Sequence, residues 1–293
     1  MSDESWTLTA TPSADQLSPR DFQKIAALVT RHSGIKLPLN KHSMLEGRVR
    51  KRARSAGYVS IRDYCDYLFE GGGVAAELPH LIDVATTNKT DFFREPQHFQ
   101  FLETRMLPDL LLRRRGQTRN KPTIKVWSAA CSNGAEAYTI AMVLSDVAAA
   151  RGDFNWSILG TDISRRILVQ ARQAVYFADV IQPVPAPKQS RYVMHERCVT
   201  PMPQVRIVPE LRHSVRFAPL NLMDATYPFD IDFDIIFLRN VLIYFEKTDQ
   251  KAVVTRLCSH LRSGGYLLLG HAESMIGIEL GLRQVAPATF QVP

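Results

Sequence analysis

Apolar residues in the first part of the chain recur at the spacing of an α-helix. Ser18 precedes Pro19 and an acidic residue, a combination typical of a helix start, because the hydroxyl can cap the first turn and proline tolerates the first position. Apolar residues continue over Phe22–Val29 at helical spacing, and Gly34 ends the element. Further helices are predicted over 41–56, after Ser60 and after Gly71–Gly73. This part of the chain is therefore predicted to be all helical.

After about residue 120 the pattern changes to strands that alternate with helices. Short apolar runs predict the strands, and Ala135–Ala150 predicts a helix. The predicted strands cover 124–129, 157–161, 215–218, 233–238, 266–270 and 289–292. Such alternation favours an α/β fold with a mostly parallel sheet that helices cover on both faces. Residues 179–214 interrupt the pattern with several prolines and short β-like pieces, which predicts an inserted subdomain.

Size and composition fit this organisation. The chain has 293 residues, of which 45% are hydrophobic, so it can build a sizeable core in more than one domain. The expected segments are a mobile tail over 1–16, a helical domain over 17–87, a linker and connecting helix over 88–120, and an α/β domain over 121–293.

Composition also argues against several classes of protein. No apolar segment reaches the length of a membrane span, and the first residues lack the basic and apolar regions of a signal peptide. The four cysteines have no metal-ligand spacing, so they are expected to be reduced thiols, and no metal site is predicted. We therefore expect a cytoplasmic protein without membrane insertion. The net charge of +7 indicates an acidic partner, either nucleic acid or acidic protein.

An arginine–asparagine pair stands inside an apolar run. Arg239 and Asn240 lie within Ile235–Phe245, and burying such groups without partners costs several kcal/mol. The run is interpreted as a buried strand whose carboxyl end delivers polar groups to the edge where open α/β sheets bind ligands.

Two other predicted strand ends have features of a nucleoside site. Ala130–Glu136 is a loop of small residues that opens a helix, and small residues let a ligand approach the backbone. The next strand ends at Asp162, where an acidic residue suits the hydroxyls of a ribose. As structural alternatives, Asp162 caps the helix at Ser164, and Glu136 complements the dipole of its own helix. The absence of GxGxxG or a Walker lysine weakens dinucleotide and nucleoside-triphosphate interpretations.

Five motifs follow one another in an order that resembles a known family. They are Thr87–Arg94 (TNKTDFFR), Trp127–Ser132 (WSAACS), Gly160–Ser164 (GTDIS), Arg239–Phe245 (RNVLIYF) and Gly270–Ser274 (GHAES). Together they resemble the CheR family of chemotaxis receptor glutamate O-methyltransferases over nearly all of the chain. The resemblance implies S-adenosylmethionine as cofactor and a class I methyltransferase fold. That fold is a Rossmann-like, mostly parallel sheet with a small inserted antiparallel β-subdomain, preceded by an all-α domain.

The resemblance also implies roles for particular residues. Those implied to hold the cofactor are Asn88, Thr90, Arg94, Glu136, Asp162, Asn221, Leu222, Leu238, Arg239 and Asn240. Arg94 and Tyr244 match the family positions nearest the transferring methyl group and are the implied catalytic residues. No general base is required, because a glutamate side chain has a pKa of about 4.3 and is ionised at neutral pH. His271 is interpreted as part of a hydrogen-bond network at a strand end.

The predicted helix over 41–56 has a basic face. Its cations, which form a stripe beside an apolar one, are Lys41, Arg48, Lys51 and Arg52. A charge run is more commonly a solvated face, but the resemblance implies that this helix meets the acidic methylation helices of a receptor. Some family members also bind a receptor C-terminal peptide through a glycine-rich turn. His195–Pro203 has prolines and no glycine at the equivalent place, so no such tether is expected.

The chain is accordingly expected to transfer methyl groups from S-adenosylmethionine to glutamate side chains of chemoreceptor cytoplasmic helices, leaving S-adenosylhomocysteine and methyl esters. One alternative is a methyltransferase of the same fold that acts on another substrate, including nucleic acid. The motif expected for amino methylation of bases is absent, so no nucleic-acid partner is expected. The other alternative is a non-catalytic scaffold that senses S-adenosylmethionine. Retention of Arg94, Asp162, Asn240 and Tyr244 argues against it.

Overall fold

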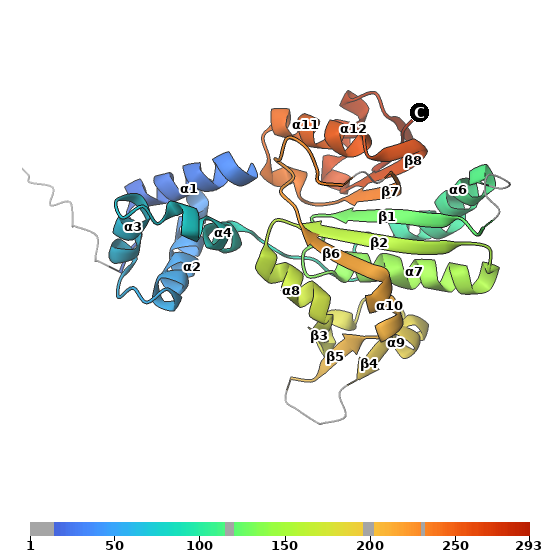
Figure 1. Ribbon diagram of the computed structural model, residues 1–293, viewed down its shortest axis with the longest axis horizontal. Coiled ribbons are helices and arrows are strands. Elements are labelled where there is room, and N and C mark those ends of the chain that lie inside the picture. The colour runs from blue at the N-terminus through green and yellow to red at the C-terminus, as the bar shows by residue number, and fades with distance from the viewer. Residues whose placement is uncertain (1–14, 115–119, 196–201, 230–231) are drawn as a thin grey trace, which may run out of the picture. The chain divides into compact units, whose positions relative to one another are not determined.

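The structure is a computed structural model that describes residues 15–114, 120–195, 202–229 and 232–293 (Figure 1). It divides into two compact units, one that ends at Thr86 and one over Thr87–Pro293. Each unit buries a hydrophobic core of its own. Within the described ranges, no helix has both the length and the apolar character needed to cross a membrane.

The first unit is all helical, as predicted. Its elements are α1 (Pro19–Ser33), the 3₁₀ turn η1 (Leu39–Lys41), α2 (His42–Ser55), α3 (Ile61–Phe69) and α4 (Val74–Ala85). The predicted ends of α1 are confirmed. Ser18 Oγ accepts a hydrogen bond from the Asp21 N–H at 3.0 Å, and Gly34 follows the helix with a φ of 72°. The apolar faces of α1 to α4 pack into one core, which includes Phe22, Ile25, Val29, Leu45, Val49, Tyr64 and Leu81.

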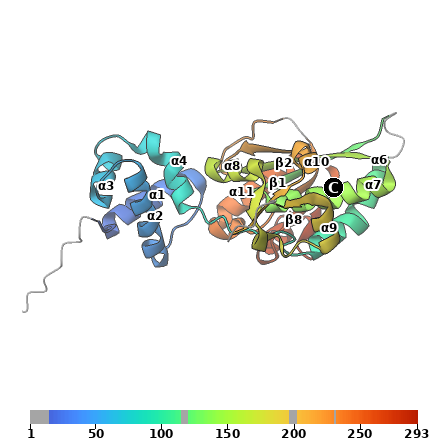
Figure 2. The ribbon, with the colours of Figure 1, turned by 90° about the horizontal axis from the view of Figure 1, so that it is seen from below.

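The second unit is built on a sheet in which the described residues form seven strands (Figure 1, Figure 2). In spatial order they are β6 (Val215–Pro219), β2 (Asn155–Asp162), β1 (Thr123–Ala129), β7 (Phe233–Leu238), β8 (Leu261–Leu269), β10 (Thr289–Gln291) and β9 (Arg283–Ala286). The first five run parallel, and β10 and β9 are antiparallel to their neighbours. The predicted mostly parallel sheet is therefore confirmed. Only β9 had no counterpart among the predicted strands.

The strand order reverses direction at β1. The chain moves outward from β1 through β2 to β6 on one side, and then returns to β7 and β8 on the other. Ala129, the last residue of β1, is paired with Leu238 at the end of β7 and with Thr161 near the end of β2. Three strands therefore end side by side at a topological switch point, the place where open α/β sheets bind ligands.

Helices flank this sheet (Figure 1). They are α5 (Gln97–Phe101), the π-helical turn η2 (Leu102–Met106), α6 (Leu107–Arg114), α7 (Ala135–Arg151), α8 (Arg165–Gln173), α11 (Lys247–Cys258) and α12 (Met275–Glu279). The first half of α7 is almost entirely buried, which explains its apolar composition. Residues 88–120 were expected to form a linker and connecting helix. The structure places α5, η2 and α6 there, and buried residues such as Phe99, Leu102 and Leu107 join the core of the second unit.

The predicted inserted β-subdomain is confirmed. It is an antiparallel sheet in which the described residues give the order β3 (Val175–Phe177), β5 (Gln204–Ile207) and β4 (Val193–His195). The turn η3 (Ala178–Ile181) and the helices α9 (Ala186–Tyr192) and α10 (Pro209–Ser214) complete it. Residues 196–201 lie outside the described residues. They make up most of His195–Pro203, the segment on which the expectation about a receptor-peptide tether depends.

Candidate functional site

Asp162 joins the loops that follow β1 and β2. Its side chain is 7% exposed. Oδ2 accepts a hydrogen bond from the Ser132 N–H at 2.9 Å, and Oδ1 accepts one from the Ser164 N–H at 2.9 Å. The N-cap of α8 is Ser164, whose Oγ accepts from the Ile167 N–H at 3.2 Å. Asp162 is therefore not the cap itself, but it fixes the loop of small residues that leads into α7.

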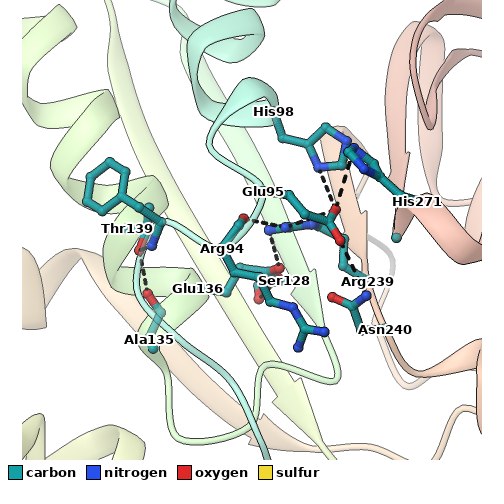
Figure 3. Close-up of polar contacts among 12 residues, drawn as sticks. Arg94, Glu95, His98, Ser128, Ala135, Glu136, Thr139, Arg239, Asn240 and His271 are labelled. Atoms are coloured by element: carbon teal, nitrogen blue, oxygen red, sulfur yellow. Dashed lines mark hydrogen bonds and ion pairs between the residues drawn. The ribbon is translucent and has the colours of Figure 1, made fainter. Parts of the chain in front are cut away.

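Arg239 is the centre of a buried polar network (Figure 3). Its side chain is 2% exposed and follows β7 directly. Nη1 lies 3.1 Å from Glu136 Oε2, and Nη2 lies 3.2 Å from Glu95 Oε2. Nη2 also donates a hydrogen bond to the Arg94 carbonyl, and the guanidinium lies 5.4 Å from the ring centre of Phe99. The arginine predicted to need partners in an apolar run thus has them.

The pKa values of the two carboxylates beside Arg239 shift in opposite directions. Burial raises the pKa of Glu136, although Arg239 and a hydrogen bond from Ser128 Oγ at 2.7 Å oppose that shift. Burial also acts to raise the pKa of Glu95, but the charge of Arg239 and the hydrogen bonds from Arg239 and Asn240 together outweigh it, and the pKa lies below its usual value. The Arg239 guanidinium thus counterbalances the carboxylates that the fold buries at this edge of the sheet.

The segment that carries Arg94 is tied to the loops at the strand ends. Ser132 Oγ donates a hydrogen bond to the Asn88 carbonyl at 3.0 Å, and the Phe93 N–H donates one to Thr139 Oγ1 at 3.2 Å. Asn88, Thr90 and Arg94 are all partly buried. The Arg94 guanidinium donates to the Lys89 carbonyl at 3.4 Å.

Asn240 has a left-handed backbone that a buried carboxylate holds in place. Its φ is 58°, and its N–H donates to Glu273 Oε2 at 2.8 Å. The same oxygen accepts from the Gly270 N–H at 2.9 Å, and Oε1 accepts from the Ile243 N–H at 3.3 Å. A Cβ on Gly270 would lie 2.6 Å from Glu273 Oε2, so only glycine fits at this position. The Asn240 amide donates to Glu95 Oε1 at 3.4 Å.

Backbone strain gathers at this edge of the sheet. In the described part of the chain, seven non-glycine residues have a positive φ. Five of these belong to the segment before α5, to the loop after β1 or to the end of β7: Phe93, Glu95, Ala130, Ser132 and Asn240. Conformations of this kind cost of order 1–3 kcal/mol each and gather where a site demands them.

The other predicted cofactor residues lie at the same edge. Leu238 is fully buried at the end of β7. Asn221 and Leu222 follow β6, next to β2, where the Leu220 N–H donates to the Asp162 carbonyl at 3.0 Å. Asn221 Oδ1 accepts from the Met223 N–H at 3.0 Å, which shapes this turn. Tyr244 is partly buried in the 3₁₀ turn η4 (Leu242–Tyr244).

The basic face predicted on α2 is only partly available. Arg48 Nη1 donates to the carbonyls of Val84 and Thr86 at 2.8 and 2.7 Å, at the end of α4. Arg52 makes two hydrogen bonds with Glu77, Nε to Oε2 at 2.8 Å and Nη2 to Oε1 at 2.7 Å. The prediction counted these arginines as substrate contacts, but both guanidinium groups hold the helical unit together. The exposed cations of the predicted set are Lys41 and Lys51.

Several polar residues of the site escaped prediction from the sequence. Glu95 and Glu273 hold Arg239 and Asn240, and His98 lies on α5 beside Glu95, with its Nδ1 at 3.5 Å from Glu95 Oε2. Glu273 stood in a quoted motif without a role. The spacing of Glu95 and His98, three residues apart at a helix start, was the available signal for this pair.

Comparison with known proteins identifies the family. The all-alpha domain of the CheR methyltransferases matches residues 20–86, and their SAM-binding domain matches residues 88–289. The chain is 35% identical over 272 residues to a chemotaxis protein methyltransferase of Borreliella burgdorferi, covering 92% of this chain and 93% of that protein. It is 36% identical over 269 residues to the chemotaxis protein methyltransferase of Escherichia coli, covering 90% and 87%. It is 33% identical over 273 residues to chemotaxis protein methyltransferase 2 of Pseudomonas aeruginosa, covering 92% of each chain. The chain belongs to the CheR methyltransferase family and is an S-adenosylmethionine-dependent methyltransferase.

Proposed function

We propose that this enzyme transfers the methyl group of S-adenosylmethionine to glutamate side chains of chemoreceptors and leaves methyl esters. The single observation that carries the proposal is the match of both CheR domains over residues 20–289, with one short gap between them. The polar groups at the switch point support it, because they lie where a nucleoside ligand is bound in folds of this kind.

The residues at the strand ends fit S-adenosylmethionine. Asp162 fixes the loop after β1 by accepting hydrogen bonds from the Ser132 and Ser164 N–H groups, and an acidic residue at this strand end suits the hydroxyls of a ribose. Glu136 and Arg239 bring a carboxylate and a guanidinium to the same strand ends, which suits the ammonium and carboxylate groups of the cofactor. We assign the cofactor to these residues and to Asn88, Thr90, Arg94, Asn221, Leu222, Leu238 and Asn240.

The chemistry requires positioning more than proton transfer. The bound cofactor supplies an electrophilic methyl group, and a glutamate carboxylate with a pKa of about 4.3 arrives already ionised. The protein then has to remove water from that carboxylate and hold it in line, which can lower the barrier by roughly 7–11 kcal/mol. Arg94 would orient a carboxylate through paired N–H donors. Tyr244 would lie against the cationic centre and direct its hydroxyl toward the site.

Charge on the helical unit supports an acidic protein substrate. Lys41 and Lys51 are exposed, so both can attract the acidic helices of a receptor, chiefly by raising the association rate. Arg48 and Arg52 would contribute to the potential of this face while they keep their contacts within the unit. We propose that the enzyme acts in the cytoplasm and does not use a receptor C-terminal peptide as a tether, because His195–Pro203 contains prolines and no glycine.

A labelling experiment tests the proposal. The purified chain would be incubated with methyl-labelled S-adenosylmethionine and a receptor cytoplasmic fragment, and the labelled fragment would then be treated with mild alkali. Methyl esters of glutamate release their label under these conditions, whereas methylated nitrogen or carbon retains it. A fragment with its acceptor glutamates changed to glutamine is the matched control. Label that stays on the protein, or that appears equally on the control fragment, would overturn the assignment.

A further inference from the structure

Three side chains with no role in the proposed transfer converge behind Arg239. They are Glu95, which precedes α5, His98 on α5, and His271 in the turn η5 (His271–Glu273). His98 Nδ1 lies 3.5 Å from Glu95 Oε2, and His271 Nε2 lies 3.9 Å from the same oxygen. Figure 3 shows both rings directed at this carboxylate from segments far apart in the sequence.

His98 is the most unusual member of this group. It is 2% exposed, and neither of its ring nitrogens has a hydrogen-bond partner among the described residues. The Pro287 carbonyl acts on the ring as a weak acceptor, outside strict hydrogen-bond geometry. Buried polar groups are almost always well paired, so a buried imidazole with so little hydrogen bonding is suited to a further partner from outside the protein. Burial, together with the charge of Arg239, lowers the pKa of His98 to about 4, so the ring is neutral near pH 7.

Glu95 Oε2 is a second buried polar atom that accepts no hydrogen bond from the described residues. It lies at ion-pair distance from Arg239 Nη2. One anionic oxygen and two imidazoles, all within 4.8 Å of one another, form the ligand set typical of Zn²⁺ and related ions.

We infer that Glu95, His98 and His271 bind a divalent transition-metal ion of the zinc class. In a tetrahedral site with bonds of about 2.0–2.1 Å, donor atoms stand about 3.3 Å apart, so small side-chain movements would close the present distances. The His271 side chain is 50% exposed, which gives the ion an entry path and leaves room for a water as the fourth ligand. This proposal departs from the expectation, drawn from the cysteine pattern, that the chain has no metal site.

The charges around the cluster are compatible with such an ion. Arg239 lies 3.2 Å from Glu95 Oε2 and would compete for it. Glu136 also contacts Arg239, at 3.1 Å, so the guanidinium keeps one carboxylate partner when Glu95 turns to a metal. The ion would connect α5 to η5, and binding to the folded state alone would raise the unfolding temperature.

Direct binding tests this inference and does not depend on methyl transfer. The full chain, untagged and stripped of metal with a chelator, would be titrated with Co²⁺ as a spectroscopic probe and with Zn²⁺ by calorimetry. We expect one ion per chain, visible absorption from Co²⁺ with nitrogen ligands, and a higher unfolding temperature with Zn²⁺. His271→Ala and Glu95→Gln should each weaken binding at least about tenfold, since each removes or neutralises a ligand.

An exposed histidine provides the control. His213 on α10 is exposed, so His213→Ala should leave metal affinity and the Co²⁺ spectrum unchanged. His271→Ala carries the main test because its side chain is half exposed, whereas replacing buried His98 risks misfolding. Affinity within twofold of wild type in both His271→Ala and Glu95→Gln would overturn the site. So would the absence of one-to-one binding at micromolar concentrations of either metal.

Discussion

Arg239 Nη1 and Glu136 Oε2 lie 3.1 Å apart, although 103 residues separate them in the sequence. The contact joins the end of β7 to the first turn of α7 across the switch point. The sequence allowed Glu136 to be interpreted as a residue that complements the dipole of its own helix. It also pairs with Arg239, whose guanidinium donates to the Arg94 carbonyl. Residues proposed to hold the cofactor are thereby tied together from three separate segments of the chain.

Replacing Arg239 should destabilise the second unit. Arg239→Leu leaves Glu136 and Glu95 buried without a cation, and breaking a buried pair on one side costs about 3–5 kcal/mol. Urea unfolding would measure the loss. Arg166→Leu is the matched control, because Arg166 is exposed on α8 and its loss should change stability by no more than about 0.5 kcal/mol. Equal stability of the two variants would contradict the role of Arg239.

Asp162→Asn should weaken binding of S-adenosylhomocysteine while the fold persists. The amide oxygen can still accept one backbone N–H, but the charge-assisted bonds to a ribose are lost. Hydrogen bonds to charged groups contribute about 1.5–3 kcal/mol, so affinity should fall roughly tenfold to hundredfold. Calorimetry gives the affinity and thermal unfolding reports the fold. Unchanged affinity would remove Asp162 from the cofactor site.

Arg94→Ala should lower turnover at least ~100-fold, because an acceptor carboxylate held about 1 Å from its reactive position reacts far more slowly. Arg94→Lys should recover little, since an ammonium lacks the fork of parallel donors. The kcat of receptor methylation would be compared with the Kd of S-adenosylhomocysteine for both variants. Wild-type turnover in Arg94→Ala would refute the assignment.

Charge reversal at the exposed lysines should slow receptor methylation. The double variant Lys41→Glu, Lys51→Glu is expected to lower kcat/KM most strongly at low salt, because steering by exposed charges is screened by ions. Arg20→Glu with Arg62→Glu makes the same change in net charge at exposed positions on other helices. Arg48 is left intact, since its loss would free the Val84 and Thr86 carbonyls. If both double variants behave alike, the effect is one of net charge and not of this face.

The helical unit should lose stability in acid through Glu77. Hydrogen bonds from Arg52 hold the pKa of Glu77 below its usual value, against the opposing effect of burial. A depressed folded-state pKa gives stability that is complete above the unfolded pKa of about 4.3 and is lost as pH falls through the folded value. Glu77→Gln should therefore destabilise this unit near neutral pH, by about 1.5–3 kcal/mol, and flatten its response to acid. Amide hydrogen exchange in α2 and α4 would follow this unit alone. A variant that keeps the acid transition would show that other groups cause it.

Local signals allowed most of the fold to be predicted from the sequence. The Ser18 cap and Gly34 mark the ends of α1, and apolar runs mark the parallel strands, because each signal lies within a few residues of the feature that it specifies. β9 was missed because its first residues are exposed and polar at the edge of the sheet, where packing demands no alternation.

The site was harder to predict, because its contacts span long separations in sequence. A helical wheel places Arg48 and Arg52 on one face of α2, but it cannot show that α4 offers carbonyls and Glu77 opposite them. In the same way, nothing near Glu95 in the sequence indicates that His271 lies close to it in the fold. Five ordered motifs pointed to one edge of the sheet, and only the folded chain shows which side chains meet there.

The left-handed residues around the strand ends have a consequence for efforts to make this enzyme more heat resistant. Glycine relieves the steric conflict at a position such as Ala130, so screens for thermotolerance should find gains there. The same substitutions would let the loops sample other shapes, and turnover would suffer as the melting point rises. Selection for heat stability and selection for turnover should therefore favour different residues at such positions.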